Sequence, residues 1–158
     1  MRKAVSGMQG YYERGMGFLF RLAEVCPQDL WAGKGGGFRF WQQLYHAFWC
    51  VDYFLLPPDG SPPEKPFGRG VALFTEEPGR IPSREEILEF GNRMKARADE
   101  WIAGLDDAAL GEVHAGFTSR KGSEITNAAV FTSLAGHIMY HVGCCDSVLR
   151  DNGIKGVY

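Results

Sequence analysis

The sequence predicts an all-α protein, a four-helix bundle with a long crossover between the second and third helices. Two observations support this fold class. Four long segments carry apolar residues in the pattern of buried or half-buried helices: residues 8–25, 38–55, 83–105 and 126–152. Seven of the eight prolines lie between Pro57 and Pro82 and divide these segments into two pairs. Four such helices can bury their apolar faces against one another.

The first helix is expected over residues 8–25. Pro27 ends a pattern in which apolar residues recur at spacings of three and four: Tyr11, Phe18, Leu19, Leu22 and Val25. The glycine-rich segment 33–37 that follows is predicted to be a loop. It contains a lysine but has neither the residue spacing nor the preceding strand of a phosphate-binding loop, so we exclude that kind of site.

The second helix is expected over residues 38–55, a segment dense in aromatic residues. A strand is the competing interpretation, but 18 residues without a turn signal favour a helix. The short loop before this helix makes it an antiparallel neighbour of the first. The proline-rich connection after it is predicted to be extended, and it is long enough to cross the bundle, so the second and third helices can run parallel.

The third helix begins where Ser83 and Glu86 match a capping box, in which each side chain satisfies a free backbone N–H. Its buried stripe is expected to be Ile87, Phe90, Met94, Trp101 and Leu105. Residues 106–125 are polar and contain glycine, which indicates a connection.

The last helix should begin at a cap formed by Thr126 or Asn127 and continue to Asn152. Gly153 then supplies the left-handed residue that commonly terminates a helix.

Length and charge restrict the class of function. A chain of 158 residues can bury its own core, so residues 1–158 are expected to form a single domain. With 17 basic and 19 acidic residues the net charge is -2, which argues against a nucleic-acid partner. The N-terminus lacks the apolar stretch of a signal peptide, and the longest wholly apolar run, 47–51, is far shorter than the ~20 residues that cross a bilayer. We therefore expect a cytoplasmic protein without a membrane association and with reduced cysteines.

Three of the four histidines form a candidate metal site. His137 and His141 are four residues apart on one helix, so both rings can reach one ion. His46 lies in the middle of its own helix, at a depth where it can join them, whereas His114 lies in the polar connection. The alternative interpretation is that His46 is an ordinary core histidine and that the other two are solvated.

The three-histidine pattern differs from that of zinc proteases. Those enzymes need a glutamate directly after the first histidine of the pair, and Ile138 stands there. Three imidazoles without a fourth protein ligand leave coordination positions open for water or substrate, which is typical of a catalytic site. Candidate neighbours on the same helix faces are Gln42, Gln43, Cys50, Tyr53, Ser133, Tyr140, Cys144 and Cys145.

These segments resemble the DinB-like superfamily of metal-dependent enzymes. The resemblance lies in residues 41–46, which end in His46, in residues 137–143, and in the arginine-bearing tail 149–153. It covers nearly the whole chain and implies an up-down-down-up four-helix bundle, a homodimer, and one nickel or zinc ion held by His46, His137 and His141. Cys144 stands where many relatives have glutamine, so a role of that amide does not carry over and a thiol replaces it.

Two main functions follow from these observations. The first is a metal-dependent enzyme, a hydrolase or a thiol-dependent transferase, that acts on a small molecule, a thiol among the candidates. The second is a non-catalytic metal-binding or stress-response protein whose ion stabilises the bundle. A third interpretation is an interaction module that uses the connection between Pro57 and Pro82 as its contact surface.

Overall fold

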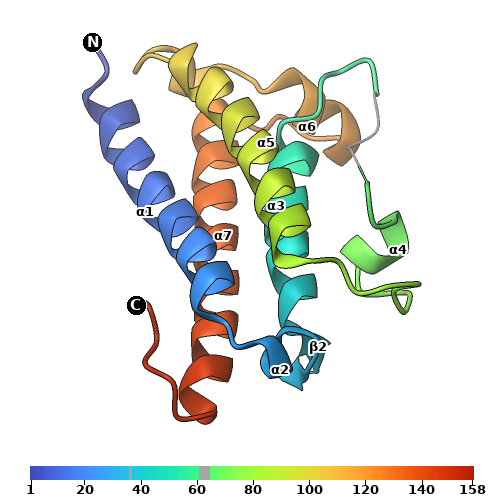
Figure 1. Cartoon of the computed structure of the whole chain (residues 1–158). Coiled ribbons are helices and arrows are strands. Elements are labelled where there is room, and N and C mark those ends of the chain that lie inside the picture. Colours follow the sequence, from blue (N-terminus) through green and yellow to red (C-terminus); the bar gives the residue numbers. More distant parts are fainter. Residues whose placement is uncertain (36, 61–64) are drawn as a thin grey trace.

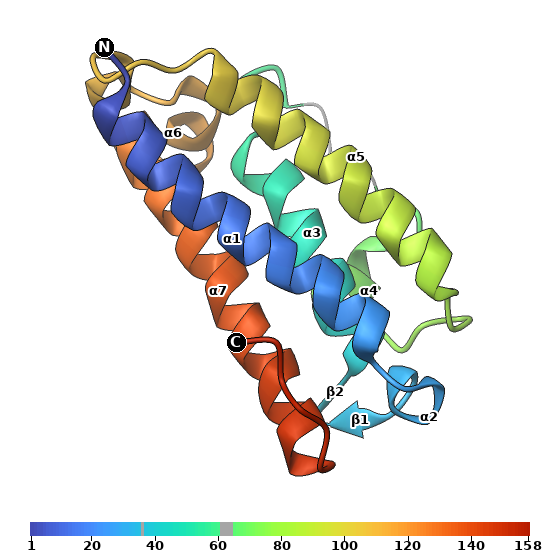
Figure 2. The same ribbon diagram turned by 60° about the vertical axis from the view of Figure 1, so that its left-hand side comes forward.

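The computed structural model describes residues 1–35, 37–60 and 65–158. Four long helices form a bundle (Figures 1 and 2): α1 (Lys3–Val25), α3 (Phe40–Phe54), α5 (Arg84–Ala103) and α7 (Asn127–Asp151). Helices α1 and α7 run in one direction, and α3 and α5 run in the other. Both α1 and α3 pack against α5 and α7, so they occupy opposite corners of the bundle. The predicted all-α class and the up-down-down-up order are confirmed. The prediction that the first two helices are neighbours is wrong, because α1 and α3 are antiparallel but lie diagonally across the bundle.

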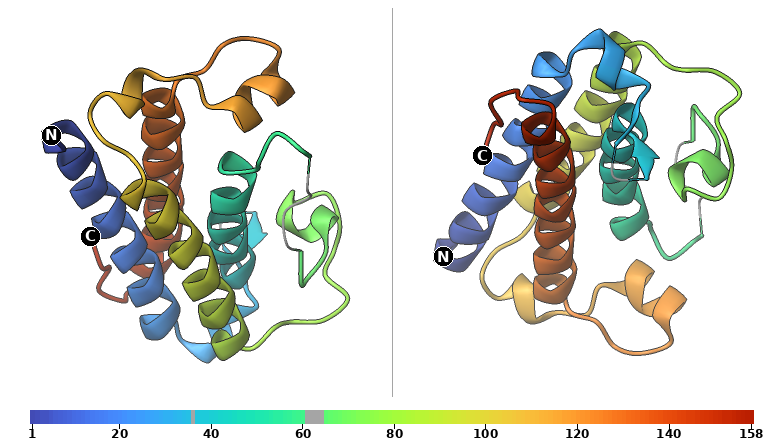
Figure 3. Two further views of the ribbon diagram at one scale, coloured as in Figure 1. Left: turned by 90° about the horizontal axis from the view of Figure 1, so that it is seen from above. Right: turned by 90° about the horizontal axis from the view of Figure 1, so that it is seen from below.

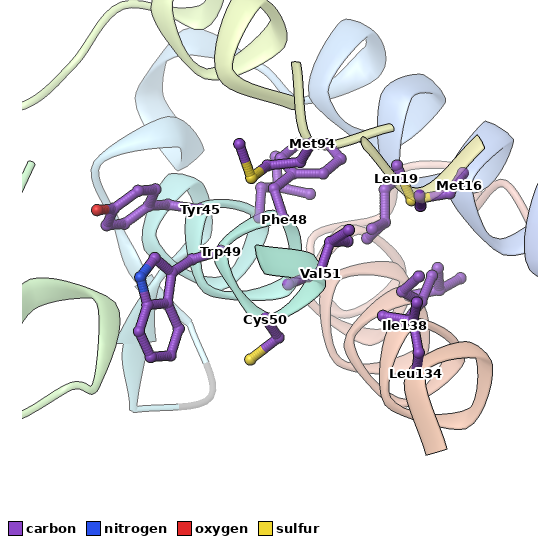
Figure 4. Packing of buried hydrophobic residues seen from close by; sticks show 14 of the residues in the cluster. Met16, Leu19, Tyr45, Phe48, Trp49, Cys50, Val51, Met94, Leu134 and Ile138 are labelled. Carbon is purple, nitrogen blue, oxygen red and sulfur yellow. The ribbon is translucent and has the colours of Figure 1, made fainter. Parts of the chain in front are cut away.

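Helix α3 is the most deeply buried of the four. Most of its residues are buried, on all sides of the helix, because α5 and α7 cover two faces and the connection to α5 covers a third. Figure 4 shows Phe48 packed beneath Met94. The close approach of α5 at this point depends on Gly91, since a Cβ there would lie 2.8 Å from the Phe48 ring. A helix that is hydrophobic all round is expected to be a core helix.

The second helix begins at Phe40, two residues later than predicted. Part of the predicted glycine-rich loop is instead a short ribbon, in which β1 (Lys34–Gly35) pairs antiparallel with β2 (Phe38–Arg39). Arg39 fixes this geometry by donating from its guanidinium to the Ala32 carbonyl at 2.8 Å. Gly36 lies outside the described residues.

The first helix begins at Lys3, five residues earlier than predicted. No side chain near its start caps it. The Asp107 carboxylate, more than a hundred residues away in the chain, accepts the backbone N–H groups of Lys3, Ala4 and Val5 at 2.9, 3.0 and 3.1 Å. This long-range cap satisfies the donors that otherwise limit the start of a helix.

The buried face of α1 also differs from the prediction. Tyr11 was assigned to the buried stripe but is 47% exposed, whereas its neighbour Tyr12 is fully buried and packs edge-on against Phe131 at 6.3 Å. Leu19 and Leu22 are buried as predicted. The one-residue difference rotates the buried face by about 100° at this turn.

The proline-rich connection contains a turn of helix that was not predicted. After residues 61–64, which include two of its prolines and are not described, α4 (Arg69–Ala72) lies beside α3. No proline falls between Pro66 and Pro78, so backbone N–H groups are available here for helical hydrogen bonds. The one-turn helix α2 (Gln28–Trp31) precedes the ribbon.

The capping box at the start of α5 is confirmed, with Ser83 accepting from the Glu86 backbone and the Glu86 carboxylate accepting in return. Ile87, Phe90, Met94 and Leu105 are buried as predicted, and Trp101 is half-buried. The helix ends at Ala103, so Leu105 is buried from the connection that follows.

The connection before α7 folds back along the bundle. It contains a 3-10 turn, η1 (Ala109–Gly111), and a short helix, α6 (Ala115–Lys121), that Figure 3 shows standing away from the end of α7. Thr126 caps α7 by accepting from Ala129, and Gly153 has the predicted left-handed backbone, with φ of 74°.

By length and composition, α7 also meets the criteria for a membrane span. A core helix of a soluble bundle meets the same criteria, and α7 packs against α1 and α3 through a buried face that includes Phe131, Leu134 and Ile138.

Candidate metal centre

The three predicted histidines lie together between α3 and α7. His46 is in the middle of α3, and His137 and His141 are one turn apart on α7, the antiparallel neighbour of α3. One ligand atom from each ring lies within 4.8 Å of those of the other two. The His46 and His137 Nε2 atoms are 3.2 Å apart. Two nitrogens on one tetrahedral zinc ion are separated by about 3.3 Å, so this spacing fits a shared ion.

Hydrogen bonds fix the orientation of two of the rings. His46 Nδ1 lies 2.5 Å from the Ala72 carbonyl oxygen, and His141 Nδ1 lies 2.8 Å from Gln43 Oε1. Both partners only accept, so each Nδ1 carries the proton and donates. The Nε2 atom of each ring is then an unprotonated lone pair, which is the form that binds a metal.

Burial keeps all three histidines neutral near pH 7. It lowers the pKa of His46, against an opposing effect of the hydrogen bond to Ala72. Burial and the neighbouring His46 lower the pKa of His137 to about 4. Burial, then His46 and His137, lower that of His141 to about 3. A metal ion therefore need not displace protons from these rings at neutral pH.

Aromatic rings surround the cluster. The Phe74 ring lies 4.7 Å from the His46 ring, and Tyr140 meets His141 edge-on at 5.0 Å. Phe74 has a left-handed backbone with φ of 59°, which is uncommon for a residue other than glycine. The nearby segment that contains Ala72 and Phe74 thus forms one side of the site.

Cys50 is the closest thiol to the cluster. Its Sγ lies 3.5 Å from His46 Nε2, and burial raises its pKa to about 12, so the thiol is protonated at neutral pH. Figure 4 shows Trp49 and Cys50 leaving α3 on the side away from α1 and α5. Cys144 and Cys145 instead line a separate hollow between α7 and the start of α3, together with Tyr140 and Gln43.

The other predicted neighbours also differ in whether they contact the histidine cluster. Gln43 reaches His141, whereas Gln42 donates to the Val71 carbonyl at 2.9 Å and so holds the segment that carries Ala72. Tyr53 stacks on Trp49 at 5.6 Å, and Ser133 is exposed.

Sequence reasoning missed the Ala72 carbonyl and the Phe74 ring. A backbone carbonyl contributes no residue-type signal, and both groups come from a connection whose path the sequence does not define.

A cavity of about 570 Å³ opens beside the cluster. His46, His137 and Cys50 face it at one end. The rest of the lining is mainly apolar and includes three cationic side chains. The apolar part is formed by Trp49, Tyr53, Phe54, Leu56, Gly60 and Leu73, and the cations are Lys65, Arg69 and Arg120. Small-molecule sites commonly have a volume of roughly 300–1,000 Å³ and such mixed walls.

The comparison with protein families agrees with this geometry. The model of the DinB superfamily matches residues 16–145, which include all three histidines, the whole of α3 and α5, and parts of α1 and α7. The chain belongs to the DinB superfamily. Neither the search of curated proteins nor the search of solved structures gives a match. This DinB-family protein thus carries a three-histidine cluster that can hold a metal ion.

Proposed function

We propose that this DinB-family protein is a metal-dependent enzyme that acts on a small molecule bound in the cavity beside His46 and His137. The observation that carries the proposal is the convergence of three neutral imidazoles, of which His46 and His137 line a cavity, and of which His46 and His141 are oriented by Nδ1 hydrogen bonds. A purely structural ion is usually enclosed by four protein ligands, whereas these rings supply three and adjoin open space.

The chain's own groups prepare the site for an ion. The Ala72 carbonyl and the Gln43 amide oxygen hold His46 and His141 with Nε2 toward the cluster. The aromatic side chains that line the cavity make this region less polar than bulk water, which strengthens electrostatic interactions there. A divalent ion held by the three rings supplies Lewis acidity for hydrolysis or for transfer of a thiol.

Nickel and zinc are the ions that we propose for this site. Both accept imidazole nitrogen as a ligand. We also propose, from the family resemblance, that the protein acts in the cytoplasm as a homodimer. Light scattering tests the assembly, and a monomer mass would contradict it.

Elemental analysis with matched variants tests the metal site. We expect about one equivalent of nickel or zinc in the wild-type protein and loss of most of it in His46→Ala, His137→Ala and His141→Ala. His114→Ala is the control, because it removes a histidine that caps α6 by accepting from the Phe117 N–H, outside the cluster. Equal metal content in all four variants would contradict the site.

Measurements of substrate turnover distinguish a catalytic metal site from one that only stores the ion or stabilises the fold. Ester, amide and thiol-transfer substrates are screened with the metal-loaded protein, with and without a chelator. The proposal expects chelator-sensitive turnover that His46→Ala abolishes. A non-catalytic metal-binding protein, the alternative, instead predicts a melting temperature that rises with metal and no turnover.

A further inference from the structure

The described lining of the cavity beside the histidines carries positive charge only. Lys65, Arg69 and Arg120 all line it, and no acidic side chain does so among the described residues. The same described residues provide no ion pair to any of the three cations.

Arg120 is held in place by neutral groups only. Its guanidinium donates to the Tyr53 carbonyl at 2.8 Å and to the Leu56 carbonyl at 3.5 Å. It lies over the rings of Tyr53 and Phe117, each 5.3 Å from the ring centroid. Its buried Nε has no hydrogen-bond partner among the described residues. These contacts fix the position of the cation without adding a negative charge to it.

The position of Arg120 depends on a tight contact between α6 and the end of α3. Gly116 packs directly against the Leu56 carbonyl, where a Cβ atom would overlap the oxygen. Figure 3 shows α6 and α4 on different sides of the C-terminal end of α3. Arg120 from α6 and Arg69 from α4 therefore reach the same cavity from two elements that do not follow one another in the chain.

A cavity lined by one sign of charge attracts the opposite charge, and apolar walls strengthen this attraction. Arginine is well suited to carboxylate and phosphate groups, because its planar guanidinium donates two parallel hydrogen bonds. Aromatic rings of the lining connect the histidines to Arg120: the Trp49 ring lies 6.3 Å from His46 and 5.6 Å from Tyr53, and Arg120 lies over Tyr53. The lining thus has an anion-binding part, an apolar part and a metal-binding part.

We propose that the substrate carries a carboxylate or phosphate group bound by Arg69 and Arg120, and an apolar body that packs against the aromatic wall. This inference rests on the proposed function, because it concerns the substrate of the same metal site. Lys65 adds a third positive charge to the lining. The substrate's reacting group then lies at the end that His46 and His137 line.

Calorimetric titration of matched probes tests the inference. The probes are 4-phenylbutyrate, 3-phenylpropyl phosphate and the neutral 4-phenylbutanamide, each added to nickel-loaded and to metal-free protein. We expect both anions to bind at least about tenfold more tightly than the amide, since one charge-assisted hydrogen bond contributes about that factor. The tighter of the two anions identifies the preferred acidic group.

Variants assign the effect to the two arginines. Arg69→Gln and Arg120→Gln should each weaken anion binding about tenfold and leave amide binding unchanged. Lys121→Gln is the control on α6, because Lys121 lies over Phe117 and does not line the cavity. Arg69 is exposed, so Arg69→Gln decides the question if Arg120→Gln fails to fold.

The outcomes separate this inference from the proposed function. Equal affinity for anions and amide, no measurable binding of either anion, or unchanged anion binding in Arg69→Gln overturns the anion site, even where nickel binds stoichiometrically. A protein that binds neither nickel nor zinc but keeps the arginine-dependent preference for anions supports the anion site and overturns the metal-dependent function.

Discussion

Gln43 is the residue through which the metal centre can be tested without removing a ligand. Its side chain is only 8% exposed, and its Oε1 accepts the hydrogen bond from His141 Nδ1 at 2.8 Å. Gln43→Leu keeps a side chain of similar size but removes the acceptor. The buried Nδ1–H is then left without this partner, in the metal-free and in the metal-bound protein alike.

The expected magnitude follows from the difference between these two states. A hydrogen bond between neutral groups contributes about 0.5–1.5 kcal/mol, and one to a charged group contributes about 1.5–3 kcal/mol. A bound cation makes the imidazole N–H a stronger donor, so the bond to Gln43 gains about 1–1.5 kcal/mol when the ion binds. Its removal should raise the Kd for nickel or zinc about tenfold.

Competition against a chromophoric chelator at pH 7.5 measures this Kd. Gln43→Glu is the matched control, because its carboxylate accepts the same hydrogen bond and should restore tight binding. Chemical denaturation of the metal-free Gln43→Leu protein should show a loss of about 1–3 kcal/mol in the free energy of unfolding, as expected for an unsatisfied buried donor. Unchanged metal affinity in a folded Gln43→Leu variant would refute the reasoning.

Further predictions concern pH, the thiol and the long-range cap. Burial lowers the pKa values of His137 and His141 from 6.5 to about 4 and about 3, so the unfolded chain binds more protons than the folded one in this range. The free energy of unfolding of the metal-free protein should therefore fall as the pH drops from about 6.5 to about 4, with a shallower slope in a variant carrying His137→Gln and His141→Gln. Cys50→Ala should retain one equivalent of metal by elemental analysis, because three imidazoles form the site; loss of the metal would make the thiol a ligand. Asp107→Ala should cost about 1 kcal/mol in chemical denaturation and speed hydrogen exchange at residues 3–5, and unchanged exchange there would show that the cap is not needed.

The fold was predictable because its main signals are local. The apolar periodicity, the capping box at Ser83 and Glu86, and the terminating Gly153 depend on residues within a few positions of one another. The position of the prolines gave the long crossover and hence the parallel arrangement of α3 and α5. The prediction fails where the boundary of a helix depends on a residue far away in the sequence. Helix α1 is an example, because its start depends on Asp107.

The histidine cluster was predictable in part for the same reason. The spacing of His137 and His141 places both on one helix face, and His46 faces them because α3 and α7 are antiparallel neighbours. The orientation of the rings was not predictable, because it depends on the Ala72 carbonyl and on which of two adjacent glutamines turns toward α7.

The sequence by itself thus determined the four helices, their order and the three histidines that share a depth in the bundle. The tertiary structure alone decided what else lies around them: the carbonyl that holds His46, the Phe74 ring beside it, and the cavity to which Arg69 and Arg120 contribute. The physical reason is that helix formation and face periodicity are set by neighbours in the chain. The lining of a site is instead set by connections that pack against the bundle through contacts between residues far apart in sequence.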